Sequence, residues 1–151
     1  MFQKIVTDRK LLSIPCQPCK NIQEGEKIGE LLLAYLEKTS DGVGLAANQL
    51  GLKQKVCVIN VEKPIILVNP EIVGRFEKIE FIEACLSFAG DYINTERYAN
   101  IAVKADNHSE TLFFDKNKNL LECICVQHEI DHLNGITMYE RQIKGDKDGH
   151  I

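Results

Sequence analysis

The stretch Leu120–Gly135 carries the side chains of this chain that are best suited to chemistry. Within it, His128 and His132 are four positions apart, so an α-helix would place both imidazoles on one face, about 5.4 Å apart along the axis. Glu129 directly follows the first histidine, where its carboxylate can reach a metal-bound water without binding the metal itself. This H-E-x-x-H pattern is typical of metal-dependent hydrolysis of peptide-like substrates.

The context of these histidines favours a metal site over a solvated helix face. Two histidines at helical spacing are a weak signal alone, since short motifs recur by chance. Here a glutamate stands between them, an apolar run precedes them, and Gly135 follows where a glycine commonly ends a helix. The alternative of two exposed, non-ligating histidines stays open at this point.

A catalytic metal site needs a third protein ligand and an open position for water. The longer metzincin motif, H-E-x-x-H-x-x-G-x-x-H, fails because Met138 stands where its third histidine belongs. Cys85 lies at the end of an expected strand, whereas Cys125, one helical turn before Glu129, is expected to line the pocket or the core. The other side chains considered as the third ligand are expected to be less well placed, which leaves Cys85; they are Glu140, His150, His108, Cys123 and Cys125.

Hydrophobic periodicity predicts helices near the two ends of the chain and strands in the middle. The amphipathic stretch Glu26–Lys38 is expected to form a helix that packs on the core. The expected strands are Val56–Val61, Ile65–Val68, Arg75–Phe81, Ile101–Ala105 and Thr111–Phe114, of which the last two pair across a turn at 106–109. These elements predict one compact α+β domain over residues 1–151, with antiparallel strands packed around a central metal-binding helix and a short polar tail from about residue 144.

Length and composition limit the classes of function. A chain of 151 residues can bury one core, and its hydrophobic and charged fractions of 44% and 26% are those of a soluble globular protein. No apolar run is long enough to span a bilayer, and the N-terminus lacks the core of a signal peptide, so we expect a cytoplasmic protein without membrane partners. A net charge of −4 without a basic block disfavours nucleic acid as a partner.

Six cysteines in a chain without a secretion signal are expected to be thiols, metal ligands or core residues rather than disulfides. Cys16-Gln17-Pro18-Cys19 has the C-x-x-C form of a redox motif. A redox role requires a strand before the motif and a helix opening at it. The prolines instead place the motif in an irregular segment before the first helix, which favours a loop with incidental thiols.

Three segments, in this order along the chain, resemble the three motifs of the peptide deformylase family. They are Gly42-Val43-Gly44-Leu45-Ala46-Ala47-Asn48-Gln49, Glu83-Ala84-Cys85-Leu86-Ser87 and His128-Glu129-Ile130-Asp131-His132. The resemblance extends from Leu11-Leu12 to about Met138. It implies one divalent metal ion held by Cys85, His128 and His132, with Fe(II) as the native ion and zinc, nickel or cobalt as substitutes. It also implies that the substrate is an N-formyl-methionyl nascent peptide, from which formate is released.

The same resemblance assigns catalytic roles. Metal-bound hydroxide would attack the formyl carbon, with Glu129 as the general acid and base. The side-chain amide of Gln49 and the backbone N–H of Leu86 would donate hydrogen bonds to the oxyanion. We further expect Glu83 and Asp131 to support the metal ligands, Asp131 by pairing with Arg97 or a backbone donor.

On the substrate side, the resemblance implies an apolar pocket for the methionine side chain. Small residues around Gly44 would let the peptide add as an extra strand beside Gly42–Gly44. The residues expected to contact substrate are Val43, Gly44, Phe81, Glu83, Leu121, Ile124 and Cys125.

Some features depart from the common family pattern. Ala84 stands where the family commonly has a glycine, and Ala89 where it commonly has a proline. Tyr92 stands where many relatives have an arginine that contacts the peptide backbone, so a weaker affinity for longer peptides is expected. The basic C-terminal helix implicated in ribosome docking is replaced by a short polar tail, so weak ribosome recruitment is expected. A zinc endopeptidase and a closed, non-catalytic metal or redox site remain alternatives, although an adjacent Glu129 has no use in a closed site.

Overall fold

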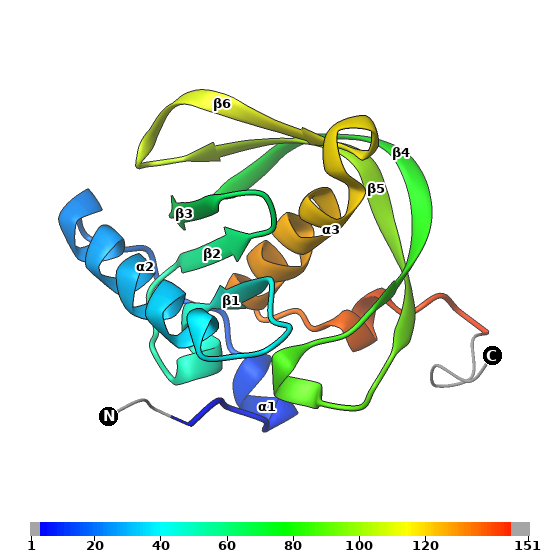
Figure 1. Cartoon of the computed structure of the whole chain (residues 1–151), viewed down its shortest axis with the longest axis horizontal. Helices are drawn as coiled ribbons and strands as arrows, with labels where there is room; N and C mark the ends of the chain where they lie inside the picture. Colours follow the sequence, from blue (N-terminus) through cyan, green and yellow to red (C-terminus); the bar gives the residue numbers. More distant parts are fainter. Residues whose placement is uncertain (1–3, 146–151) are drawn as a thin grey trace.

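Two three-stranded antiparallel sheets enclose one helix in the computed structural model, which describes residues 4–145 (Figure 1). The strand orders are β1-β2-β3 and β4-β5-β6. The expected α+β fold with antiparallel strands around a central helix is therefore confirmed. The elements are α1 (Arg9–Leu12), α2 (Ile22–Glu37), β1 (Gly44–Ala46), η1 (Ala47–Leu50), β2 (Val56–Asn60), β3 (Pro64–Val68), β4 (Glu71–Glu83), η2 (Leu86–Phe88), β5 (Ile93–Ala105), β6 (His108–Asp115), α3 (Lys116–Leu133) and η3 (Met138–Arg141), where η marks a 3-10 helix.

Helix α3 is the element that the two sheets enclose (Figure 1). Asp115 caps its first turn by accepting hydrogen bonds from two backbone N–H groups, both at 2.9 Å. Asn119 leaves helical geometry, and its side chain caps a second start by accepting from the backbone N–H of Glu122 at 3.0 Å. Every residue of Cys123–Leu133 is buried. The histidine motif therefore lies on a rigid helix within the protein interior.

The far end of α3 is closed by Gly135. This residue adopts φ +76°, the left-handed conformation that glycine takes without strain. It follows the C-cap residue Asn134. The expectation that Gly135 ends this helix is confirmed.

Helix α2 covers the outer face of the β1-β2-β3 sheet. It begins at Ile22 rather than at the expected Glu26, because Asn21 accepts a hydrogen bond from the backbone N–H of Glu24 at 2.8 Å and caps the helix earlier. The first turns bury Gly25, where a Cβ would lie 2.5 Å from a methyl carbon of Val68. Because glycine makes this close contact without an apolar side chain, the hydrophobic periodicity of the sequence does not reveal that the helix starts at Ile22.

The second sheet is a long meander. The expected pairing of the last two strands is confirmed, with Val103 opposite Leu112. The strand expected at Arg75–Phe81 extends further in both directions, to Glu71–Glu83. Its C-terminal extension is what brings Glu83 into the interior.

Several expectations about the ends of the chain need comment. The C-x-x-C segment lies between α1 and α2, so its expected place before the first helix is wrong: the four-residue α1 precedes it. Residues 146–151, which include most of the polar tail and His150, lie outside the described residues. Among residues 4–145, no helix has both the length and the apolar character needed to cross a membrane.

Candidate active site

Three buried ligand atoms converge where the end of β4 meets α3. The Cys85 thiol and the imidazoles of His128 and His132 lie within 4.8 Å of one another, as a single group of potential metal ligands within residues 4–145. The Cys85 Sγ atom is 3.4 Å from Nε2 of His132, which is 3.2 Å from Nε2 of His128. The rigid α3 fixes both histidines, and Cys85 follows the last residues of β4.

These donors suit a divalent transition-metal ion. Thiolate and neutral imidazole are the ligands that zinc and ferrous iron accept. Nδ1 of His128 faces a Glu83 carboxylate oxygen at 2.8 Å, which leaves Nε2 directed at the other two donors. Burial, together with the neighbouring His128, lowers the pKa of His132, so its imidazole is neutral and able to bind a metal.

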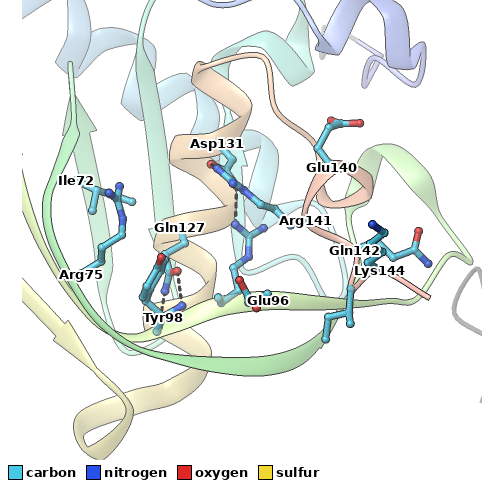
Figure 2. Close-up of a pocket in the computed structure, with 12 residues that line it drawn as sticks. Ile72, Arg75, Glu96, Tyr98, Gln127, Asp131, Glu140, Arg141, Gln142 and Lys144 are labelled. Carbon is cyan, nitrogen blue, oxygen red and sulfur yellow. Dashed lines mark hydrogen bonds and ion pairs between the residues drawn. The ribbon is translucent and has the colours of Figure 1, made fainter. Parts of the chain in front are cut away.

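A chain of buried ion pairs supports His128 from behind. Glu83 also accepts two hydrogen bonds from Arg97, one from Nε to Oε2 and one from Nη2 to Oε1 at 2.8 Å. Arg97 in turn donates to Asp131 at 2.5 Å, so the expected pairing of these two residues is present. Asp131 also accepts two hydrogen bonds from Arg141, each 2.9 Å long (Figure 2).

The charges in this chain are mutually compensated. Burial alone would raise the pKa of Glu83, but hydrogen bonds from Arg97 and His128 outweigh it and hold that pKa well below its usual range. Contacts with Glu83 and Asp131 likewise raise the pKa of Arg97 against the effect of its burial. Glu83 therefore remains an anion that can orient His128.

Of the other side chains considered as the third ligand, those within residues 4–145 lie elsewhere. Glu140 accepts hydrogen bonds from Thr137 and pairs with Arg9, and Nε2 of His108 lies 3.0 Å from a backbone carbonyl oxygen. The Cys123 thiol is directed at backbone carbonyls of β5. Cys125 contacts the Val43 carbonyl at 3.5 Å instead of the metal group.

Glu129 stands beside the converging ligands without joining them. Its Oε1 atom is buried and has no hydrogen-bond partner among the described residues. Burial raises the pKa of Glu129 to about 7, against the opposing effect of His128. A carboxyl group with such a pKa can both accept and release a proton near neutral pH.

A pocket of about 480 Å³ opens next to Glu129. Among the residues that line it are all those expected on the substrate side: Val43, Gly44, Phe81, Glu83, Leu121, Ile124 and Cys125. Glu83 is only 3% exposed and is engaged by Arg97 and His128, so its main contacts are with the metal-ligand support. Ala84, Ala89 and Tyr92, which depart from the family pattern, line the same pocket.

Gln49 points its side-chain amide at the Cys85 thiol. Its Oε1 atom accepts from the backbone N–H of Ala46 at 2.9 Å, which fixes the orientation of the amide. Its Nε2 atom donates to the Ser87 hydroxyl at 3.0 Å and lies 3.6 Å from the Cys85 thiol. Leu86, the other expected oxyanion donor, opens η2 directly after Cys85 and lines the pocket.

Three supporting residues were not identified from the sequence. Ser87 holds the Gln49 amide, and the Asn48 amide donates to the backbone carbonyl of His132 at 2.6 Å. Arg141 completes the ion pairs of Asp131. Ser87 and Asn48 stand inside the quoted motifs, which was an available signal, whereas nothing local marks Arg141.

The C-x-x-C cysteines show no sign of redox activation. Cys16 and Cys19 are both buried and unpaired. Burial raises the pKa of each thiol to about 11, which disfavours the thiolate that redox exchange requires. The structure agrees with incidental thiols in a loop.

Replacing Gly44 with alanine is expected to lower turnover by about 10²-fold, because displacing a catalytic group by about 1 Å can have that effect. A Cβ at Gly44 would lie 2.5 Å from the Cys125 sulfur and 2.7 Å from Oε2 of Glu129, so both side chains would have to move. Steady-state kinetics of G44A measure the loss. G74A is the matched control in another strand, since its Cβ meets only Ala102 at 3.5 Å. Equal activity of G44A and G74A would contradict the prediction.

An α+β fold that encloses converging metal ligands, with a proton-accepting carboxyl beside an open pocket, defines a metal-dependent hydrolase. Comparison with known families identifies which one. The sequence profile described as "Polypeptide deformylase" matches residues 2–148, so the chain belongs to the peptide deformylase family. This confirms the resemblance seen in the three motifs, and the chain is an enzyme of that metal-dependent class.

Individual relatives agree with this assignment. The chain is 37% identical over 125 residues to a peptide deformylase of Hydrogenovibrio crunogenus, covering 78% of this chain and 73% of that protein. It is 41% identical over 115 residues to one of Endomicrobium trichonymphae, covering 72% and 68%.

Solved structures show the same fold. A peptide deformylase from Synechococcus elongatus, crystallised in complex with actinonin, superposes with a TM-score of 0.83 at 29% identity, covering 95% of this chain and 80% of that one. A probable peptide deformylase from Synechococcus phage S-SSM7 gives a TM-score of 0.79 at 30% identity and covers 92% and 99%. Members of the family remove formyl groups from nascent peptides, and this chain shares that general activity.

Proposed function

We propose that this enzyme hydrolyses the formyl-methionine amide of nascent chains, with Cys85, His128 and His132 holding one divalent ion and Glu129 as general acid and base. The observation that carries the proposal is the buried carboxylate oxygen of Glu129, which has no hydrogen-bond partner within residues 4–145. Glu129 lines the same open pocket as Cys85 and His128. A closed structural metal site would require no such group. Fe(II) is the proposed native ion, with zinc, nickel or cobalt as substitutes.

A divalent ion held by Cys85, His128 and His132 would supply a nucleophile near neutral pH, because such an ion lowers the pKa of bound water from about 15.7 to about 7. Glu129 accepts the proton from the attacking water, because its pKa of about 7 matches that task. The same carboxyl then returns the proton to the departing amine. The proton thus moves through one side chain in both halves of the reaction.

The oxyanion formed from the formyl oxygen requires hydrogen-bond donors. Gln49 Nε2 is preorganised by its contacts to Ala46 and Ser87, and it faces the metal ligands. Leu86 directly follows Cys85 in the chain and lines the same pocket, and its backbone N–H is the second proposed donor. Losing one such donor typically lowers the rate by about 10²–10³-fold.

Substrate selection follows from the pocket and the sheet edge. Val43, Phe81, Leu121 and Ile124 give the pocket an apolar lining suited to an unbranched methionine side chain. Within the described part of the chain, β1 is an edge strand that pairs only with β2, so an extended peptide can add alongside it.

The test is an anaerobic assay of formate release from a short formyl-methionyl peptide, with metal content measured on the same sample. Anaerobic handling protects a ferrous thiolate site from oxidation. Formate release with the peptide chain intact, lost on chelation and restored by Fe(II), is the expected result. Cleavage of an internal amide bond in an unformylated peptide would instead indicate an endopeptidase, and absence of both products from the metal-loaded protein would refute the proposal.

A further inference from the structure

A second cavity, of about 640 Å³, shares no lining residue with the substrate pocket (Figure 2). It lies between β4, β5, α3 and the segment that follows η3. Of the residues that line this cavity, the ion pairs that support His128 include only Asp131, Arg97 and Arg141. The rest of the cavity has no role in the proposed reaction.

The carboxylates that line this cavity already have cationic partners. Asp131 accepts hydrogen bonds from two arginines. Glu140 pairs with Arg9, and Glu96 pairs with Lys78 at 3.6 Å. Neither Arg9 nor Lys78 lines the cavity, so positive charge from outside it compensates two of its three carboxylates.

Several donors that line the cavity have no acceptor. The side-chain nitrogen of Gln142 is buried and lacks a hydrogen-bond partner in the part of the chain that the structure describes. Arg75 packs over the Tyr98 ring at 5.7 Å, and within residues 4–145 no carboxylate contacts it or Lys144. A buried donor without a partner is unfavourable, so the Gln142 nitrogen is suited to an acceptor from a ligand. Arg75 and Lys144 are exposed, and their charges are available to an anion.

The placement of the cations indicates an extended anion. Figure 2 shows Arg75 on one side of the cavity and Lys144 on the other, with Arg141 between them. The lining holds four cationic residues against three carboxylates, in a chain whose net charge is −4. Arginine forks bind phosphate oxygens in pairs, and lysine binds phosphate as a point charge.

We propose that this cavity binds a small ligand carrying two or more phosphate groups, with Arg75 and Lys144 contacting separate phosphates and Gln142 donating to one phosphate oxygen. The site is distinct from the substrate pocket. The proposal therefore stands independently of the deformylation mechanism.

Inorganic pyrophosphate and tripolyphosphate are the probes, titrated into the metal-loaded protein by calorimetry and followed by amide and arginine NMR signals. Saturable one-to-one binding is expected, with shifts at Arg75 and Gln142. Arg75→Gln and Lys144→Gln should each weaken binding by about tenfold, since each removes a charge-assisted contact. Gln142→Leu should weaken it by a smaller factor, because it removes one neutral donor.

Lys104→Gln is the control, since Lys104 is an exposed lysine of β5 that does not line the cavity. The affinity of the Lys104→Gln variant for the two probes should equal that of the unmodified protein. Thermal melts should show that all variants fold. Metal content measured after titration excludes chelation, which would affect every variant equally. No saturable binding at millimolar probe, or equal affinity in the Arg75, Lys144 and Lys104 variants, would overturn the proposal.

Discussion

Replacing Glu129 with glutamine is expected to lower kcat by about 10²–10⁴-fold, the range for losing a general acid and base, while the metal remains bound. Glutamine keeps the size of the side chain but cannot accept the proton of the attacking water. The three ligand atoms belong to other residues, so the metal site should persist. Formate release and metal content, measured on the same preparation, check both parts of this expectation.

Glu122→Gln provides the matched control for this variant. Glu122 is also a glutamate of α3, but it does not line the substrate pocket. E122Q should retain full turnover. If E129Q also retained it, the role of Glu129 would be refuted, and if E129Q lost its metal, Glu129 would have to be counted among the residues that hold the ion.

Replacing Arg97 with methionine is expected to destabilise the fold by about 3–5 kcal/mol, the usual cost of removing one partner from a buried ion pair. Arg97 is only 3% exposed and joins Glu83 to Asp131, so its loss leaves two buried carboxylates without their shared cation. Because Glu83 orients His128, metal affinity should fall as well, by about 10–100-fold. Urea unfolding of the metal-free protein measures the first effect, and competition with a chelating dye measures the second.

Lys78→Met separates this effect from the loss of any positive charge. The Lys78–Glu96 pair is exposed, with 3.6 Å between its charged atoms, and such pairs contribute at most about 1 kcal/mol. K78M should therefore change stability little and leave metal affinity unaltered. A similar loss of stability in both variants would show that the buried ion pairs do not support the site as described.

The chemical core of the site could be predicted from the sequence because it is encoded locally. Helical spacing alone places His128 and His132 on one face, and Glu129 is adjacent in the chain. The third ligand is different, because Cys85 lies on another element and no spacing rule relates it to the histidines. The expected placement of the other cysteines and histidines leaves Cys85 as the candidate, and the resemblance to a family makes that assignment specific.

The supporting ion pairs were predicted only in part, for a physical reason. Asp131 stands inside the histidine motif, so a partner such as Arg97 could be sought, but which strand faces it depends on tertiary packing. Arg141 is the last residue of η3, a 3-10 helix of four residues that is too short to show a periodic pattern. Likewise the first turn of α2 is buried through Gly25, which packs closely without the apolar side chain that would mark a helix face.

The ion-pair chain behind His128 also bears on the order in which the protein is completed during synthesis. Its members come from β4, β5, α3 and η3, and the last of them is Arg141. Cys85, His128 and His132 have all been synthesised before that residue is added, so a shorter nascent chain would hold the ligands without their full support. Because metal binding and folding are coupled, we expect stable loading of the ion only after the ribosome has added η3.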